Sequence, residues 1–288
     1  MRSIKKIISS QKVNMGGIIL EQPLPYRGVD QIDPFLLVHH WAQKMNGGKD
    51  QAKAGVGPHP HRGFSPITFI FKGSVYHQDS HGHKKLVKAG GTQWMNSGKG
   101  VIHSERPSKE IAEEGGEFEI IQFWMNTPSK HKLNNYSYQP LSKEETPVII
   151  SKDGKIKTYV VAGTLNGVDS KISTFTEALI LRFEIEKGGK TSINIPKDYN
   201  AFIYQLDGDL NINDSQHTKK KQLTWFNNDD STIQIEGISS TRAILLAGKP
   251  LKEPVVSYGP FVMNTELEIK QAISDYQNGK MGILKEEF

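Results

Sequence analysis

The sequence of 288 residues contains no cysteine. This absence excludes disulfide frameworks, thiolate zinc sites, cysteine-bound iron–sulfur clusters and cysteine nucleophiles. A metal ion in this chain would therefore be held by imidazole and carboxylate groups. The sequence also lacks any apolar run of the ~18–20 residues that a membrane span requires, and its N-terminus lacks the apolar core of a signal peptide. We therefore expect a cytoplasmic protein without a membrane contact.

Charge of one sign is only slightly in excess, because 36 Lys and Arg face 31 Asp and Glu. The excess lies in residues 1–140, which carry 18 basic and 11 acidic side chains. These basic residues are dispersed, and no basic helix or RNA-binding aromatic pattern accompanies them. The lysines at 219–221 lie between polar residues and fit a solvated hairpin tip. The composition therefore argues against nucleic-acid binding.

Short runs of β-branched and aromatic residues, separated by glycine turns, recur along the chain. Helical patterns are missing between these runs, so the spacing predicts an all-β fold of sandwiches or barrels rather than βαβ units. The chain length favours two domains. The expected strands cover residues 67–71, 117–124, 158–161, 178–185, 201–204 and 243–246.

A polar, proline-containing connector predicts where the two β domains divide. We expect an N-terminal domain over residues 1–130, a linker over 131–150, and a C-terminal domain over 151–288. The second domain should end in a short helix, because Thr265 and Glu268 match a capping box ahead of helical spacing. The segments FIFKGSV and YQLDGDL form a weak internal repeat, which predicts equivalent turns in two similar barrels.

Histidine is abundant, and eight of the ten histidines lie between His39 and His103. His59 and His61 stand two residues apart in GVGPHPHRGF, so both imidazoles project from the same face of an extended strand. NSGKGVIHSERP repeats this spacing with His103 and Glu105. If the two strands meet inside a barrel, three imidazoles and one carboxylate converge on one ion. These donors suit Fe(II), Mn, Ni, Cu or Zn, and affinity alone does not choose among them.

Other histidines have simpler interpretations. An isolated His-x-His pair more often lies on a surface or in a turn than on a metal, whereas two i, i+2 pairs in one domain favour the metal hypothesis. His81 and His83 lie in the polar segment HQDSHGHKK, which is typical of solvated loop histidines. His39 and His40 are adjacent, so their rings would point to opposite faces of a strand. We expect His217 to be a loop residue.

The motifs GPHPHRGF, QWMNSGKGVIHSE, AGKPLKEPVVSYGPFVMNT and EIKQAISDYQNGKMG closely resemble the pirin family of bicupin proteins. The resemblance extends over nearly the whole chain, including GVDQIDPFLLVHH. It implies two jelly-roll cupin barrels packed face to face, and we expect a monomer. It further implies a non-haem iron site, Fe(II), in the N-terminal barrel only, held by His59, His61, His103 and Glu105. The second barrel would then serve packing, pocket closure or partner contact.

One position departs from the family pattern. Many pirins carry Glu directly after the HPHRGF block, and here Ser65 and Pro66 stand in that place. Because this Glu is not the usual iron ligand in pirins, metal binding should survive the change. The departure puts in doubt the hydrogen bonding around the ligands and the charge on the substrate side of the site.

The resemblance implies two kinds of activity. Some pirins are described as quercetin (flavonol) 2,3-dioxygenases, and others as metal- or redox-dependent regulators that act through protein partners. In the enzyme, the flavonol 3-hydroxyl would bind the metal as an oxyanion. If it loosens from the metal, Glu105 would act as the catalytic base that takes its proton, and ring cleavage by dioxygen would release carbon monoxide.

Several side chains near the ligands in sequence have either a pocket role or a core role. Phe64, Trp94, Met95 and Phe123 would line an aromatic substrate pocket or fill the barrel. Gln122 would be a pocket residue or point outward from its strand. The basic first half and the departure after HPHRGF favour the regulatory alternative. A cupin isomerase or a sugar-binding protein would fit the architecture but not these motifs.

Overall fold

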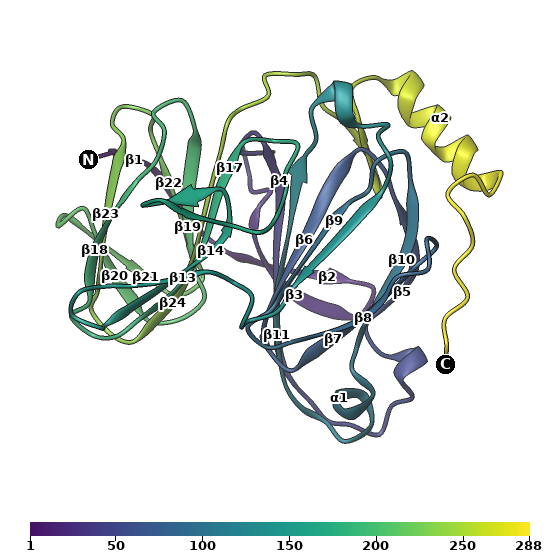
Figure 1. The fold of residues 1–288 in the computed structure, drawn as a ribbon, viewed down its shortest axis with the longest axis horizontal. Coiled ribbons are helices and arrows are strands. Elements are labelled where there is room, and N and C mark those ends of the chain that lie inside the picture. Colours follow the sequence, from purple (N-terminus) through teal and green to yellow (C-terminus); the bar gives the residue numbers. More distant parts are fainter. The chain divides into compact units, whose positions relative to one another are not determined.

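The structure, a computed structural model, describes residues 1–288 and consists mainly of short antiparallel strands (Figure 1). The α-helices are α1 (Lys109–Glu113) and α2 (Glu266–Gln277), and two short 3₁₀ turns, η1 (Gln51–Lys53) and η2 (Ser129–His131), accompany them. This all-β architecture with a short C-terminal helix confirms the predicted fold class. None of the helices is long and apolar enough to span a membrane.

The chain forms two compact units, and each unit is assembled from two separate segments. Residues 37–143 and 252–288 form the unit that we call the first barrel, and residues 144–251 and 1–36 form the second barrel. The sequence-based division, which split the chain at a linker over 131–150, differs from these units in both terminal segments. Long-range strand pairing places those segments, and local sequence patterns carry no information about such pairing.

Both barrels consist of short strands joined by turns. The strands of the first barrel are β4 (Phe35–Met45), β5 (Val56–His61), β6 (Phe64–Lys72), β7 (Ser74–Asp79), β8 (Lys84–Lys88), β9 (Thr92–Asn96), β10 (Val101–Pro107), β11 (Gly116–Asn126), β12 (Ser137–Leu141), β25 (Val256–Tyr258) and β26 (Phe261–Met263). The strands of the second barrel are β1 (Ile4–Ser9), β13 (Val148–Ile150), β14 (Ile156–Ala162), β15 (Thr164–Leu165), β16 (Val168–Asp169), β17 (Ala178–Ile185), β18 (Lys190–Asn194), β19 (Asn200–Gln205), β20 (Asp209–Ile212), β21 (Gln216–Lys219), β22 (Gln222–Phe226), β23 (Thr232–Gly237) and β24 (Thr241–Gly248). Between β1 and β4 the chain forms β2 (Gln11–Met15) and β3 (Ile18–Leu24), which pair with each other.

Specific contacts fix the terminal and connecting segments in their units. Strand β1 pairs antiparallel with β22, and the Arg2 guanidinium donates to the carbonyl oxygens of Tyr199 and Pro196 at 2.7 and 2.6 Å. Strand β12, inside the predicted linker, pairs with β9. The second strand of the C-terminal hairpin, β26, and α2 share an apolar cluster that includes Phe261 and Ala272. Backbone and apolar contacts therefore make these segments part of the barrels.

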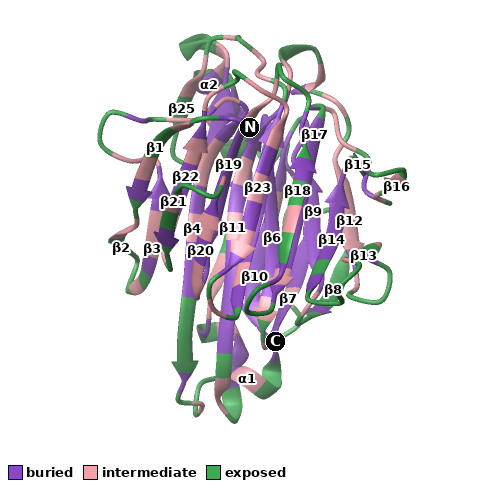
Figure 2. Ribbon diagram, turned by 90° about the vertical axis from the view of Figure 1, so that its left-hand side faces the viewer, coloured by how far each residue is buried: buried purple, intermediate pink, exposed green.

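The first barrel consists of a small sheet and a large sheet. The small sheet has the strand order β5-β10-β7-β8, and the large sheet contains β12-β9-β6-β11-β4. Thr68 on β6 donates a hydrogen bond to Glu105 on β10 at 2.9 Å, so the two sheets face each other across the interior. Figure 2 shows that strands β6, β9 and β10 are largely buried. The interior between the sheets is where a site can form.

The second barrel repeats this plan, which confirms the weak internal repeat. Its small sheet has the order β18-β23-β20-β21, and its large sheet contains β22-β19-β24-β17 in matching order. FIFKGSV runs from β6 into β7, and YQLDGDL runs from β19 into β20. In each case the chain crosses between sheets at a glycine with positive φ, Gly73 (73°) and Gly208 (67°), a conformation that favours glycine.

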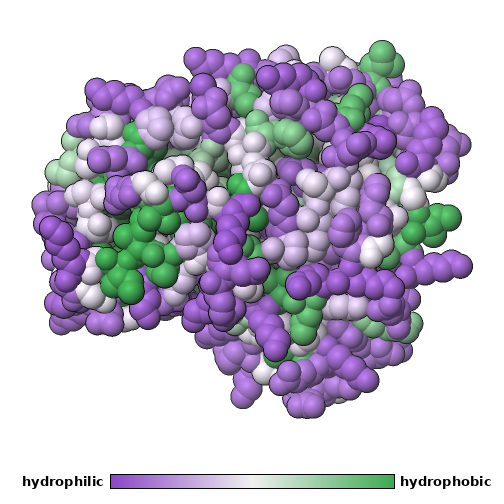
Figure 3. Space-filling view, in the orientation of Figure 1, coloured by the Kyte–Doolittle hydropathy of each residue, from purple (hydrophilic) through white to green (hydrophobic).

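Helix α2 begins as the sequence predicts. Thr265 accepts a hydrogen bond from the Glu268 backbone N–H, and the Glu268 carboxylate accepts from the Thr265 backbone N–H, which completes the capping box. Buried Ile269 and Ala272 face the apolar cluster of the first barrel, and exposed Leu267 faces away. Figure 3 shows a mostly hydrophilic outer surface with small hydrophobic patches. The core therefore lies inside the barrels, with α2 packed on the first of them.

Candidate metal centre

Three imidazoles meet inside the first barrel because of the register between two strands. On β5, His59 and His61 share a face, and β10 pairs antiparallel with β5 so that His103 stands directly opposite His59. The ring centroids of the three histidines lie 4.4 to 4.9 Å apart. Their candidate ligand atoms all lie within 4.8 Å of one another. The structure thus brings together the three histidines that the sequence singled out, and we call them the histidine cluster.

The outer ring nitrogens of His59 and His61 are fixed by backbone carbonyl groups. His59 Nδ1 lies 2.8 Å from the Gly57 carbonyl oxygen, and His61 Nδ1 lies 3.3 Å from the Pro260 carbonyl oxygen. Because a carbonyl oxygen only accepts, each Nδ1 must carry the proton. Each Nε2 then presents a lone pair to the cluster, and the two Nε2 atoms lie 3.1 Å apart. Two facing lone pairs repel each other, and a metal ion bound to both removes that repulsion.

The third imidazole carries the clearest sign that the cluster fits a metal ion. His103 is buried, and its Nε2 atom has no hydrogen-bond partner in the protein. A buried polar atom without a partner is costly unless a ligand satisfies it. Burial, followed by the nearby His59 ring, holds the pKa of His61 and His103 well below the ordinary value. Neutral imidazoles of this kind are the protonation state that a metal ion binds.

Glu105 lies on the same strand but is held by other side chains. A register irregularity separates His103 from Glu105 on β10, and the carboxylate is outside the group whose ligand atoms lie within 4.8 Å. Thr68 and Gln93 donate to its Oε1 atom. Gln122 donates to its Oε2 atom at 2.6 Å. The carboxylate therefore stands in a ring of neutral donors on the large sheet.

Gln122 is a residue for which the sequence left two orientations open. Its amide contacts Glu105 and also Thr68 at 3.1 Å, so it points into the barrel. The Trp124 indole N–H donates to the side-chain oxygen of Gln122, Oε1, at 3.2 Å. This bond holds the Gln122 amide group in its orientation. The Tyr138 hydroxyl likewise donates to the side-chain oxygen of Gln93 at 3.1 Å and so holds the other amide that bonds Glu105. Gln122 is therefore a pocket residue whose position is set by its neighbours.

Aromatic rings flank one side of the histidine cluster. Phe64 packs edge-on against His61 with centroids 5.0 Å apart, and Trp124 lies 4.3 Å from Phe64 and 5.5 Å from His61. Trp124 is half-buried, whereas Phe64 is fully buried. Phe123 packs against Phe69 instead. The sequence left a pocket role or a core role open for Phe64 and Phe123. Phe64 borders the histidine cluster, and Phe123 packs in the core.

Two of the other core candidates lie on β9. Trp94 is fully buried, and its indole N–H donates to Asn96 at 3.3 Å. Met95 is buried on the same strand. Ser65, the departure from the family pattern, donates from its hydroxyl to Asn96 Oδ1 at 2.7 Å. Since side chains alternate along β6, Ser65 and Thr68 point to opposite faces, so the departure lies on the face of β6 away from Glu105.

The remaining histidines have individual partners. His40 lies 3.1 Å from the Glu119 carboxylate in a buried pair, and burial lowers the pKa of His39 to about 4. His81 stacks on Tyr136. His217 lies in strand β21 rather than in a loop and pairs with an exposed aspartate at 3.4 Å. None of these belongs to the histidine cluster.

Sequence reasoning missed a further pair, His77 and Asp79, which follow the same i, i+2 spacing on β7. In the register of β7 with β10, Asp79 stands opposite His103 and His77 stands opposite Glu105. His77 Nδ1 lies 3.5 Å from His103 Nδ1, and His77 Nε2 lies 3.0 Å from Asp79 Oδ2. The spacing was visible in the sequence as H-x-D, but the polar HQDSHGHKK segment around it favoured a turn.

The second barrel has isoleucine where the first has histidine. Strand β18 corresponds to β5 and β23 to β10, and here Ile193 stands opposite Ile233. Both side chains are buried, with Ile195 and Ile235 beside them in one apolar core. Such a core offers no ligand atom to a metal ion.

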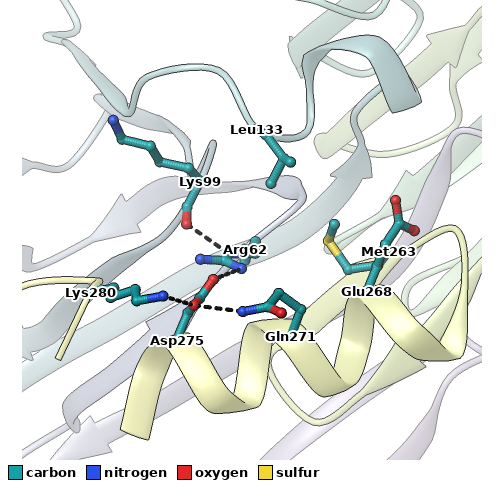
Figure 4. A pocket seen from close by; sticks show the side chains of 8 residues that line it. All are labelled: Arg62, Lys99, Leu133, Met263, Glu268, Gln271, Asp275 and Lys280. Atoms are coloured by element: carbon teal, nitrogen blue, oxygen red, sulfur yellow. Dashed lines mark hydrogen bonds and ion pairs between the residues drawn. The ribbon is translucent and has the colours of Figure 1, made fainter. Parts of the chain in front are cut away.

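A cavity of about 360 Å³ lies beside the strand that carries the cluster, between Arg62 and helix α2 (Figure 4). Arg62 directly follows His61, and its guanidinium bonds Asp275 at 2.9 Å and the Lys99 carbonyl oxygen at 2.7 Å. Asp275 also accepts from Lys280 at 2.9 Å. Three charged side chains of the lining are thus paired, and the Arg62–Asp275 pair ties α2 to the cluster strand.

Comparison with known proteins agrees with this architecture. Residues 18–125 match the family described as Pirin, and residues 180–282 match the Pirin C-terminal cupin domain. Human pirin is 38% identical over 256 residues, which cover 87% of this chain and 83% of human pirin. Pirin-1 of Arabidopsis thaliana is 33% identical over 284 residues, covering 97% of this chain and 94% of that protein.

A solved structure is similar over the whole chain. The crystal structure of quercetin 2,3-dioxygenase from Acinetobacter baumannii superposes with a TM-score of 0.91 at 31% sequence identity. The match covers 99% of this chain and 100% of that one. The bicupin fold is therefore shared along the full length.

Proposed function

Because the chain belongs to the pirin family, we propose that it is a non-haem iron protein that cleaves quercetin-like flavonols with dioxygen. The observation that carries the proposal is the histidine cluster, whose Nε2 atoms converge while His103 Nε2 lacks any protein partner. The similarity to a protein named quercetin 2,3-dioxygenase supports the substrate class. The cytoplasmic location and the monomeric state stay predictions.

His59, His61, His103 and Glu105 would hold Fe(II), and Mn, Ni, Cu or Zn suit the same donors. For Glu105 this requires its carboxylate to turn from the donors on the large sheet toward the cluster. When bound, the metal ion would supply Lewis acidity that favours the ionised form of a flavonol hydroxyl and would bring it together with dioxygen. The remaining chemistry rests on the side chains of the first barrel.

Released from the metal and returned to its donors on the large sheet, the Glu105 carboxylate would accept the proton of the flavonol 3-hydroxyl at one of its oxygens. Its hydrogen bonds come from Thr68, Gln93 and Gln122, which are neutral donors and leave the carboxylate as the charged partner of the site. The overall reaction inserts both atoms of dioxygen into the flavonol, opens its central ring and releases carbon monoxide. The ring carbons are oxidised and dioxygen is reduced, so the reaction needs no other reductant.

The aromatic wall supports a planar substrate. Trp124 is the partly accessible ring beside His61, and the fully buried Phe64 packs against both. Offset or edge-on contacts between aromatic groups each stabilise by about 0.5–1.5 kcal/mol beyond burial. Trp124 is half-buried and donates to Gln122. A flavonol ring held against this wall would have its hydroxyl near Glu105.

The experiment is turnover of quercetin by protein loaded anaerobically with Fe(II). Oxygen uptake and carbon monoxide release should occur in equal amounts, well above the rate of free iron. His59→Gln should abolish this rate, whereas His217→Gln, an exposed histidine of the second barrel, should leave it unchanged. Turnover no faster than free iron would reject the dioxygenase proposal, and tight metal binding without turnover would then favour the regulatory alternative.

A further inference from the structure

His59 and His61 are held in one tautomer by carbonyl oxygens, but the third member of the cluster has a different neighbour. His103 Nδ1 faces another imidazole nitrogen, His77 Nδ1, at 3.5 Å. An imidazole nitrogen can donate or accept, so this contact alone does not say which His103 nitrogen carries the proton. The answer depends on what holds His77.

Asp79 resolves that choice. Its Oδ2 atom lies 3.0 Å from His77 Nε2, and both residues are buried. A carboxylate only accepts, so His77 Nε2 must donate, and a ring that carries its one proton there presents a lone pair at Nδ1. His103 Nδ1 must then donate to that lone pair. His103 Nε2, the buried atom without a protein partner, is left as the free lone pair in the cluster.

Several contacts keep Asp79 and His77 in this arrangement. Asp79 also accepts from the His81 and His83 backbone N–H groups at 2.8 and 3.1 Å, from the His83 ring and from the Tyr136 hydroxyl. The His77 ring stacks on Tyr138 with centroids 4.1 Å apart and planes inclined by 6°. The acceptor and the ring are therefore both positioned before any metal binds.

We propose that Asp79 and His77 are positioning residues that fix the tautomer of His103 and thereby prepare the third imidazole ligand of the metal site. This rests on the proposed metal function of the cluster and extends it to residues outside the four ligands. Partners of this kind around a ligand commonly change metal affinity by about 10–100-fold. The proposal concerns metal binding and is independent of the substrate.

The first test uses the unaltered protein. Imidazole ¹H–¹⁵N correlation spectra of the metal-free, histidine-labelled chain report which ring nitrogen is protonated. We expect His77 with its proton on Nε2 and His103 with its proton on Nδ1. A His103 ring protonated on Nε2 would overturn the proposal, and this result does not depend on how any variant folds.

The second test measures affinity for Fe(II) alone, anaerobically, by competition with a chelator. Asp79→Asn keeps the shape but offers His77 a donor, so His77 and His103 should change tautomer and the dissociation constant should rise by about 10–100-fold. Asp209→Asn makes the same change in the His217–Asp209 pair of the second barrel, so it should change the constant less than about threefold. Equal affinities for Asp79→Asn and wild type, or an equal loss in Asp209→Asn, would overturn the proposal. Neither test measures quercetin turnover. A failure of the dioxygenase proposal is therefore distinguishable from a failure of the tautomer proposal.

Discussion

His59 and His103 stand directly opposite each other on antiparallel strands, with ring centroids 4.4 Å apart. This one cross-strand pair sets the geometry of the site, since His61 follows from the two-residue period of β5. A shift of one residue in the β5–β10 register would send His103 to the other face. The metal site is therefore a property of strand pairing as much as of residue type.

The first prediction concerns metal content. We expect one metal ion per chain after loading with Fe(II) and desalting, because the second barrel has buried isoleucines at the matching positions. Inductively coupled plasma mass spectrometry gives this ratio. His103→Gln should reduce the content strongly, and His217→Gln should not. Two ions per chain would contradict the account of the second barrel.

The second prediction is a pH dependence of the metal-free protein. Burial, with the neighbouring His59 ring, holds the pKa of His61 and His103 well below 6.5 in the folded chain. Between pH 7.5 and 5.5 the unfolded chain therefore binds protons at these positions and the folded chain does not. The free energy of unfolding should fall as the pH falls through about 6.5, by about 1 kcal/mol per imidazole.

Urea unfolding in the presence of a chelator at the two pH values checks this slope. His103→Gln should make the change of unfolding free energy with pH shallower, because it removes one of the two buried imidazoles whose pKa is lowered. His217→Gln removes an exposed histidine and should leave the slope as it is. Stability that rises as the pH falls across this window would contradict the prediction.

A buried lysine gives the third prediction. Lys132 is 1% exposed, and its Nζ donates to the Gly63 carbonyl oxygen, Asn126 Oδ1 and the Val262 carbonyl oxygen at 2.6, 2.6 and 2.9 Å. Lys132→Met would leave three buried acceptors without a donor, so the free energy of unfolding should fall by about 3 kcal/mol. Lys130→Met, at an exposed position, should change it by less than about 0.5 kcal/mol. Equal urea midpoints for the two variants would refute the role of Lys132.

The fourth prediction concerns Glu105. Gln122→Leu removes the donor to Glu105 Oε2 and should lower kcat for quercetin by about tenfold, less than the roughly 10²–10⁴-fold that a whole acid–base group contributes. Fe(II) affinity should change little, since the three imidazoles remain. Gln43→Leu, an exposed position on β4, serves as the control. An unchanged kcat would show that the Gln122 contact has no catalytic effect.

Helix α2 provides the fifth prediction. Hydrogen bonds from Lys280 and Arg62 lower the pKa of Asp275 to about 2, so its carboxylate is charged at neutral pH. Asp275→Ala would free Arg62, the residue next to His61, and we expect Fe(II) affinity to fall by about tenfold. Glu177→Ala breaks an exposed ion pair of the second barrel and should have no effect. Equal affinities for both variants would mean that α2 does not support the cluster.

Local patterns predicted the elements that local physics determines. The run over 178–185 coincides with β17, and α2 begins at its capping box. The i, i+2 histidines were found because a strand places alternate side chains on one face. The pirin resemblance is confirmed by the family match over both barrels.

Features that depend on distant pairing were not accessible from sequence. The exchange of terminal segments between units rests on contacts such as β1 with β22 and α2 with Phe261. His77 and Asp79 have the same i, i+2 spacing as the ligands. Their role depends on which β10 residues lie opposite them, and this register cannot be read from one sequence. The hydrogen bonds of Glu105 to the opposite sheet were hidden for the same reason.

Anomalous diffraction at the iron edge, from crystals of the Fe(II)-loaded protein, tests the metal site most directly. We predict one strong peak per chain, bordered by the Nε2 atoms of His59, His61 and His103, with the Glu105 carboxylate turned toward it. A peak elsewhere in the chain, or no peak at the histidine cluster in fully loaded crystals, would contradict this prediction.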